Sequence, residues 1–148
     1  MEMTLKVKKL RDGAVVPKRA TEGSAGMDLY ALLDGDVTLN PGDISLIPTG
    51  IAIELPSPDY VAYIFARSGL AIKHGITLAN SVGVVDSDYR GEVCVGLCNI
   101  SKTPYTVTPG ERIAQLVISP VSLTPTEEAE ELSDTSRGTG GFGSTGKA

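Results

Sequence analysis

Short strand-like stretches follow one another along the chain up to Pro120, and turn signals separate them. Val, Ile and Thr recur within these stretches, while 17 Gly and 9 Pro interrupt them, a pattern that is typical of short strands joined by turns. Only Ser68–Lys73 reads as briefly helical. The pattern predicts an all-β sandwich, jelly roll or barrel rather than the alternating strands and helices of a dinucleotide-binding fold. The predicted strands are Leu5–Leu10, Met27–Leu33, Ile44–Pro48, Ile51–Leu55, Tyr60–Ala66, Ile76–Asn80, Glu92–Ile100, Tyr105–Val107 and Ile113–Pro120.

The chain changes character after Pro120. Residues 124–134 are acidic and carry Leu132 as their bulky apolar side chain, and residues 135–146 are rich in glycine with one aromatic side chain, Phe142. Such a segment cannot bury enough apolar surface to fold by itself. We therefore expect one barrel domain at residues 1–123 and a flexible arm at residues 124–148, which either stays free or orders on something else.

Charge and length limit the partners. The chain has 148 residues, the length of one domain, and a net charge of −5, so it lacks the basic surface that a nucleic-acid partner requires. The negative net charge still allows a small anionic ligand, because a few cations and backbone N–H groups can hold phosphates. Residues 1–13 are charged, and no uncharged apolar run approaches the length of a membrane span. We expect a soluble, cytoplasmic protein with no membrane partner.

The two cysteines predict no disulfide and no metal site. Cys94 and Cys98 are four residues apart in an apolar run, which on a strand places them on one face and roughly 13 Å apart, too far for a disulfide. His74 is the only histidine, and we interpret it as a loop residue. We expect two buried free thiols.

Five short segments stand out, each modest when taken alone. They are Ala25–Ala31, Arg67–Ala71, Gly83–Glu92, Gly110–Leu116 and Arg137–Gly146. Together and in this order they closely resemble the five motifs of the trimeric dUTPase family, and the resemblance runs over nearly the whole chain. It implies a jelly-roll-like distorted β-barrel and a homotrimer whose three active sites are each built from parts of several subunits. It also implies Mg²⁺-dependent hydrolysis of dUTP to dUMP and pyrophosphate, which keeps uracil out of DNA and supplies dUMP for dTMP synthesis.

Two carboxylates mark the third segment. Asp86 and Asp88 are two residues apart, so in an extended stretch they face the same way, and one of them can accept a proton from water. From these two residues alone, an acidic hairpin tip is the favoured interpretation, and the other four segments outweigh it. By resemblance, Asp86 is the general base that directs water at the α-phosphorus of dUTP.

The resemblance also assigns the groups that face the phosphates. Gln115 is expected to touch the phosphates or the catalytic water. Asp28 is expected to hold waters around a Mg²⁺ ion that sits on the phosphates, although from the residues alone it reads equally well as a turn cap. Arg112 is interpreted as structural, near a subunit interface. Three residues of the second segment are expected to grip the phosphate chain: Arg67, Ser68 and Gly69.

Uracil recognition is expected between the predicted strands Ile76–Asn80 and Glu92–Ile100. A strand edge offers N–H and C=O groups that complement uracil and leave cytosine mispaired, and Asn80 adds an amide. By resemblance, Tyr89 packs on the sugar and excludes a 2′-hydroxyl, whereas from the residues alone a cross-strand aromatic is a fair alternative. The resemblance adds four more residues to this pocket: Gly83, Val84, Val85 and Cys94.

The arm supplies the last part of the expected site. By resemblance, Phe142 stacks on uracil and Arg137 clasps the γ-phosphate when the arm closes. The sequence leaves open whether the arm reaches its own site or that of a neighbouring subunit, and it assigns no function to residues 124–134.

Three alternatives stay open. A dCTP deaminase-type or bifunctional relative would need a polar residue that activates water at C4 of the base, and none is evident beside Asn80 and Cys94. A catalytically idle nucleotide-binding regulator is disfavoured because Asp86 is present. A structural β-domain with a disordered tail would leave the five segments unexplained.

Overall fold

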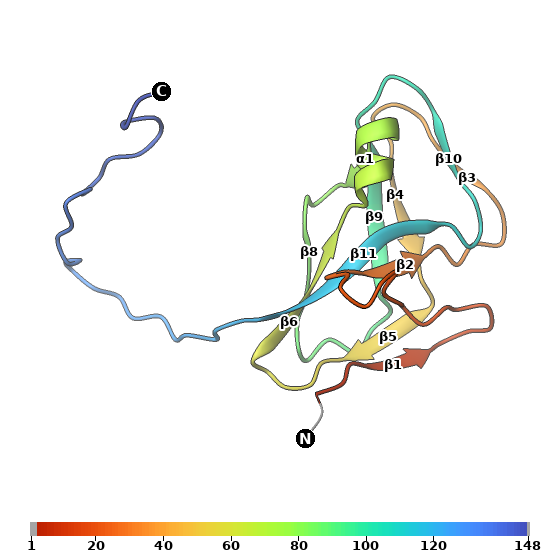
Figure 1. Ribbon diagram of the computed structural model, residues 1–148, viewed down its shortest axis with the longest axis horizontal. Coiled ribbons are helices and arrows are strands. Elements are labelled where there is room, and N and C mark those ends of the chain that lie inside the picture. Colours follow the sequence, from red (N-terminus) through yellow and green to blue (C-terminus); the bar gives the residue numbers. More distant parts are fainter. Residues whose placement is uncertain (1–2, 148) are drawn as a thin grey trace.

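The computed structural model describes residues 3–147 and shows a jelly-roll-like β-barrel, with one short helix at one end and a long extended tail (Figure 1). The helix, α1, spans Ser68–His74 and ends at Gly75, whose left-handed conformation (φ 67°) suits glycine. The strands are β1 (Lys6–Lys9), β2 (Met27–Tyr30), β3 (Val37–Leu39), β4 (Ile44–Pro48), β5 (Ile51–Glu54), β6 (Tyr60–Phe65), β7 (Ile76–Leu78), β8 (Gly83–Val85), β9 (Cys94–Asn99), β10 (Tyr105–Val107) and β11 (Arg112–Pro120).

The strands pair antiparallel in four small sheets. The largest has the order β2-β11-β6-β8, a second has the order β4-β9-β7, and two-stranded ladders join β1 to β5 and β3 to β10. β7 and β8 are close in sequence but belong to different sheets, so the chain crosses between sheets after Leu78. β8 is an edge strand because only β6 pairs with it.

Alternating side chains along β9 show how the core is filled. Val95, Leu97 and Asn99 point inward and are at most 1% exposed, whereas Cys94 and Cys98 lie on the opposite face. The cysteines are free and share one face, as expected, but they are half-buried rather than buried.

A β-bulge in β11 changes which side chains share a face. The register with β2 shifts between Arg112 and Ala114, so Arg112 and Gln115 both lie on the side that carries Asp28. Residues three apart on a regular strand would face opposite sides. The extra residue lets Ile113 and Ala114, both at most 1% exposed, enter the core together.

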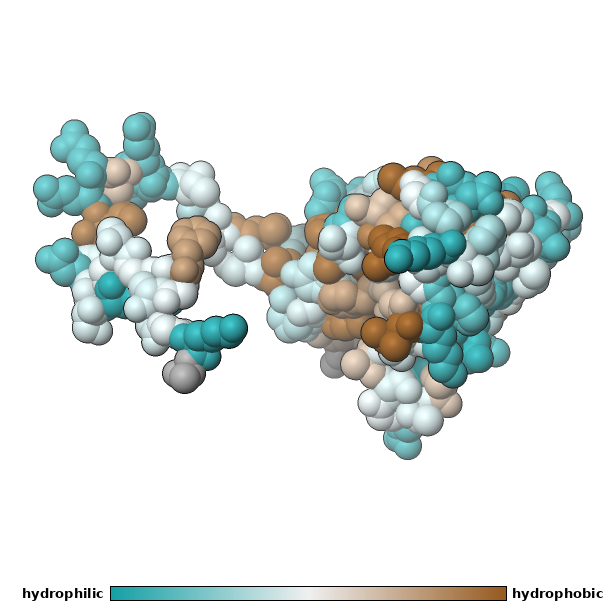
Figure 2. Space-filling model, turned by 90° about the horizontal axis from the view of Figure 1, so that it is seen from above, coloured by the Kyte–Doolittle hydropathy of each residue, from teal (hydrophilic) through white to brown (hydrophobic). Residues whose placement is uncertain are grey.

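The chain beyond Pro120 leaves the barrel and contains no strand or helix up to residue 147 (Figure 1). The tail stands clear of the barrel in Figure 2, and its two largest apolar side chains, Leu132 and Phe142, are fully exposed. The only helix within residues 3–147 is α1, which is too short to cross a membrane. The boundary expected at residue 123 lies three residues after the end of β11.

The expected strands all have counterparts in the structure, although several are shorter. The sequence interpretation missed β3 and β8, which have three residues each, although it found β7 and β10, which are equally short. His74, expected in a loop, is instead the last residue of α1, and its ring packs on Tyr105 with a centroid separation of 4.9 Å.

Candidate functional site

Seven of the residues expected to bind the nucleoside or act on it line a single hollow between β8 and β9, of about 370 Å³. We call it the β8–β9 hollow. β8 forms one wall, and its outer edge carries unpaired N–H and C=O groups because β6 occupies only the inner edge. The seven residues are Asn80, Gly83, Val84, Val85, Asp86, Tyr89 and Cys94.

Close packing fixes the position of β8. Gly83 is buried against β6, and a Cβ added to it would lie 3.0 Å from Cβ of Ile64. A larger residue at position 83 would press on Ile64, so glycine suits this close approach of the two strands. Val84 points outward and is 61% exposed, so an apolar side chain stands beside the unpaired edge.

Asp86 and Asp88 were expected to face the same way if their stretch were extended, and it is not extended. The chain turns after β8, with the N–H of Tyr89 donating to the carbonyl of Asp86 at 3.2 Å. Asp86 lines the β8–β9 hollow and Asp88 does not, although both line a neighbouring depression. Asp86 is therefore the exposed carboxylate of this hollow.

The five residues expected near the phosphates line a second hollow of about 390 Å³, which we call the Arg67 hollow. It shares no lining residue with the β8–β9 hollow. Ala20, Ser24, Ala25 and Gly26 complete its lining. The five expected residues are Asp28, Arg67, Ser68, Gly69 and Gln115.

Asp28 bridges two arginines in the Arg67 hollow. Its Oδ1 lies 3.1 Å from Nε of Arg67, and its Oδ2 lies 3.4 Å from Nη1 of Arg112. Two guanidinium groups against one carboxylate leave a net positive charge, which suits an anionic ligand in an otherwise acidic protein. Arg112 does not line this hollow and contacts it through Asp28, so the structural role expected for it stays a prediction.

Gln115 is held by a contact within the chain, whereas Gly69 has no close neighbour in it. Nε2 of Gln115 donates to the carbonyl of Ala66 at 3.0 Å, which fixes the chain immediately before Arg67. A Cβ added to Gly26 would lie 2.2 Å from Oε1 of Gln115, so glycine is needed there for the amide to fit. Gly69 has open space around it, and no close contact within this chain requires glycine.

Neither hollow includes the tail residues assigned to the site. Arg137 donates from Nε to the carbonyl of Gly140 at 2.7 Å, a contact within the tail itself. Phe142 is fully exposed, and its backbone is left-handed, with φ 52°. The structure thus brings twelve of the assigned residues into two hollows and leaves the two tail residues apart from both.

A model of the dUTPase family matches residues 12–146 of the chain. This chain belongs to the dUTPase family. Among its relatives, a deoxyuridine 5′-triphosphate nucleotidohydrolase of Neisseria meningitidis serogroup B is 53% identical over 146 residues, which is 99% of this chain and 97% of that protein. One of the same name from Caldanaerobacter subterraneus is 53% identical over 99% of both chains.

Solved structures of dUTPases share the fold. The dUTPase of Staphylococcus bacteriophage 80alpha, solved with dUpNHpp, superposes with a TM-score of 0.88 at 28% identity over 97% of this chain and 99% of that one. A dUTPase from phage phi11 of S. aureus, described with a structural Mg(II) ion, gives a TM-score of 0.79 at 24% identity over 88% and 99% of the two chains. The jelly-roll-like fold expected from the family resemblance is therefore confirmed.

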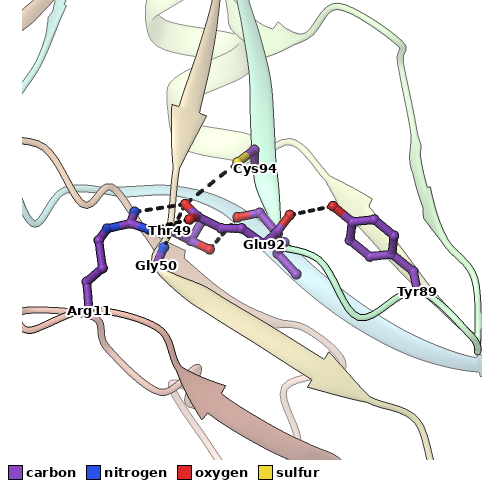
Figure 3. Close-up of polar contacts among 7 residues, drawn as sticks. Arg11, Thr49, Gly50, Tyr89, Glu92 and Cys94 are labelled. Atoms are coloured by element: carbon purple, nitrogen blue, oxygen red, sulfur yellow. Dashed lines mark hydrogen bonds and ion pairs between the residues drawn. The ribbon is translucent and has the colours of Figure 1, made fainter.

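The residues that the sequence interpretation missed lie mainly in the β8–β9 hollow. Leu46, Ile64 and Val93 line it as apolar wall residues, and no sequence signal distinguishes them from ordinary core residues. Glu92 also lines it, and its place at the end of the third motif was the one available signal. Figure 3 shows Glu92 at the centre of a polar cluster that reaches from Arg11 to Tyr89.

Charge pairing controls the titration of Glu92. Hydrogen bonds from Arg11 hold the pKa of Glu92 below its usual value of 4.5, and the N–H of Gly50 acts in the same direction, while burial opposes both. Because this pKa is lowered in the folded state, the carboxylate stabilises the fold fully above about pH 5. That stabilisation is lost as the pH falls through the lowered pKa.

The wild-type protein is therefore expected to lose its stability advantage over Glu92→Gln in acid. The melting temperatures of both proteins should be measured from about pH 7 down to about pH 3. The difference between them should be widest above about pH 5 and should shrink below the usual glutamate pKa. A difference that stays constant over the whole range would show that the charge of Glu92 contributes nothing.

Proposed function

We propose that this protein hydrolyses dUTP to dUMP and pyrophosphate by water attack on the α-phosphorus, with Mg²⁺, as a homotrimer with shared active sites. The observation that carries the proposal is the β8–β9 hollow, where an exposed carboxylate, an unpaired strand edge and a tyrosine meet. Family membership and relatives named deoxyuridine 5′-triphosphate nucleotidohydrolase support the same reaction.

The free edge of β8 suits uracil. Uracil presents a donor at N3 between two acceptors, and a strand edge presents alternating N–H and C=O groups that complement this pattern. Cytosine presents the opposite pattern at positions 3 and 4 and would leave buried groups unpaired, which strongly disfavours its binding. The amide of Asn80 lies at the same hollow and can pair with the base.

Tyr89 suits a deoxyribose. Its ring is 45% exposed at the hollow, and its hydroxyl donates to the carbonyl of Glu92 at 2.8 Å. Because the hydroxyl is already engaged, the face of the ring is the part left for the sugar. A ring fixed in this way leaves no room for a 2′-hydroxyl.

Asp86 acts as the general base. Its carboxylate stands at the end of β8, where the chain turns out of the sheet, and is exposed to solvent. It accepts a proton from a water molecule as that water attacks the α-phosphorus, and pyrophosphate leaves. Positioning and charge neutralisation supply the rest of the catalysis.

The Arg67 hollow holds the phosphates. Arg67 supplies the cation, and Asp28 orients it through the 3.1 Å ion pair. Within residues 3–147, no three His, Cys, Asp or Glu side chains converge to hold a metal ion. One carboxylate fits a Mg²⁺ ion that is bound mainly by substrate phosphates and water, with Asp28 accepting from its waters. Bound Mg²⁺ would neutralise the negative charge of the phosphates.

A trimer brings the two kinds of hollow together. One dUTP molecule needs a nucleoside site and a phosphate site side by side, whereas the two hollows of one chain have separate linings. Apolar surface on the barrel supports association, because six aliphatic side chains are between 61% and 86% exposed. They are Ile44, Leu46, Ile72, Val84, Ile100 and Leu123.

The tail serves as a lid over a completed site. Phe142 is the only aromatic residue after Tyr105, and its full exposure leaves the ring free to stack on uracil. Arg137 would then approach the γ-phosphate, and the following glycines would offer N–H groups to it. A cytoplasmic location stays a prediction.

The proposed reaction is tested by pyrophosphate release from dUTP, dCTP, dTTP and UTP, each with Mg²⁺ and again with EDTA. Release from dUTP should exceed release from each of the others by at least roughly 10²-fold, because each of them leaves polar groups unpaired or clashes with the hollow. EDTA should remove most of the activity. No release from dUTP would overturn the proposal, and ammonia formed from dCTP would indicate a deaminase.

A further inference from the structure

Arg11, in the N-terminal segment, is hydrogen-bonded to Glu92 in the wall of the β8–β9 hollow. Both terminal nitrogens of Arg11 donate to the two carboxylate oxygens of Glu92, with Nη2 to Oε2 at 3.0 Å (Figure 3). Oε2 also accepts from the N–H of Gly50 at 3.2 Å and lies 3.7 Å from Sγ of Cys94. The carboxylate therefore ties together three segments that are distant in sequence.

The main chain next to this carboxylate fixes Tyr89. The tyrosine hydroxyl donates to the carbonyl of Glu92 at 2.8 Å. Its ring lies so close to Gly91 that an added Cβ there would be 2.5 Å from the hydroxyl oxygen and 2.7 Å from Cζ. The position of the ring thus depends on where the backbone of residues 91 and 92 is held.

The next residue anchors that backbone to the barrel. The N–H of Val93 donates to the carbonyl of Ile51 at 2.8 Å, and its carbonyl accepts from the hydroxyl of Thr49. Val93 is 1% exposed, so this anchor lies in the core. Two side chains then hold the residues on the Tyr89 side of the anchor: Glu92, through Arg11, and Arg90, whose Nη2 lies 3.4 Å from Oε1 of Glu54.

We propose that Arg11 and Glu92 are positioning residues that hold Tyr89 against the sugar and so set the preference for a deoxyribose over a ribose. This inference rests on the proposed function. Arg11 is not among the residues that line the hollow, so it acts through Glu92. A bidentate pair fixes direction as well as distance, which a single surface contact does not do.

The inference is tested by comparing kcat/KM for dUTP and for UTP. Arg11→Met, Glu92→Gln and the double variant are each expected to lower the dUTP/UTP ratio about tenfold, with most of the change in KM, since a loose ring no longer excludes the 2′-hydroxyl. The double variant should lower the dUTP/UTP ratio no further than either single variant does, because both substitutions break the same Arg11–Glu92 pair. Arg11→Lys should restore part of the ratio.

Lys6→Met is the matched control. Lys6 is also paired with a glutamate, at 2.9 Å to Glu54, and neither residue lines the β8–β9 hollow. The substitution replaces a cation by methionine, as in Arg11→Met, and leaves the Arg90–Glu54 pair beside Tyr89 in place, so the dUTP/UTP ratio should be unchanged. An equal change in Lys6→Met would show a general charge effect and overturn the inference.

Two further outcomes decide the role of the pair. Loss of dUTP cleavage in Arg11→Met at an unchanged ratio would mean that the pair only stabilises the fold. A changed ratio in Glu92→Gln but not in Arg11→Met would mean that Glu92 acts directly on the substrate. Either outcome overturns the inference.

A structural readout separates this inference from the proposed function. The chain has five tyrosines, so the ring signals in a ¹³C-tyrosine NMR spectrum can be assigned to Tyr89 by comparison with Tyr89→Phe. The Tyr89 signal should shift in Arg11→Met and stay in place in Lys6→Met. A wild-type protein that cleaves no dUTP refutes the proposed function, whereas an unmoved Tyr89 signal in Arg11→Met refutes the positioning role.

Discussion

Replacing Asp86 by asparagine is expected to abolish dUTP cleavage while the barrel stays folded. Asparagine has nearly the same shape but cannot accept the proton of the attacking water, so kcat should fall by at least roughly 10²–10⁴-fold. The side chain is exposed, and no hydrogen bond or salt bridge within residues 3–147 depends on its carboxylate. Pyrophosphate release at saturating dUTP measures the loss.

Asp88→Asn provides the matched control for this prediction. Asp88 carries the same charge two residues later, but it lies within the turn and outside the β8–β9 hollow. Its substitution should leave kcat within about twofold of the wild type, in keeping with a surface change remote from the chemistry. Both variants should bind a non-hydrolysable dUTP analogue and melt near the wild-type temperature. Equal losses in the two variants would refute Asp86 as the specific base.

The sequence predicted the fold because its signals are local. Turn residues and alternating apolar positions predict strands wherever the pattern lasts four residues or more, as along β9 and β11. Among the three-residue strands, β7 and β10 were predicted and β3 and β8 were missed, although β8 forms the most important edge of the site. The role of β8 followed from the resemblance of Gly83–Glu92 to a motif of the family, and not from an alternating pattern.

The contacts inside the site could not be predicted, because they depend on bends and on distant pairing. A period of two places Asp86 and Asp88 on one face, but the chain turns after β8 and only Asp86 lines the β8–β9 hollow. The same period would separate Arg112 from Gln115, and the bulge in β11 brings both to the side of Asp28. Arg11 and Glu92 are 81 residues apart, and no motif signals their pairing.

Mixing two inactive variants is expected to restore activity if each active site joins two subunits. Asp86→Asn damages only the β8–β9 hollow, and Arg67→Ala damages only the Arg67 hollow. In a trimer that assembles at random from equal amounts of both chains, about a quarter of the sites take an intact hollow of each kind from different subunits. The mixture should therefore reach about a quarter of wild-type activity per site, whereas each variant alone stays inactive.

The measurement requires subunit exchange, so the two chains should be unfolded together and refolded, with native mass spectrometry to confirm mixed trimers. A second mixture, of Asp86→Asn with Asn80→Ala, serves as the control. Both substitutions lie in the β8–β9 hollow, so no subunit in that mixture offers an intact copy of it. Its activity should not exceed what the Asn80→Ala chains contribute on their own.

The two mixtures together locate the boundary between subunits within the site. Recovery in the first mixture alone would place the nucleoside and the phosphates of one dUTP on different chains, as the separate linings of the two hollows suggest. No recovery in either mixture, with mixed trimers present, would mean that one chain supplies both hollows to one substrate. A monomer in native mass spectrometry that cleaves dUTP at full rate would refute the shared site outright, because a complete site would then exist in a single barrel.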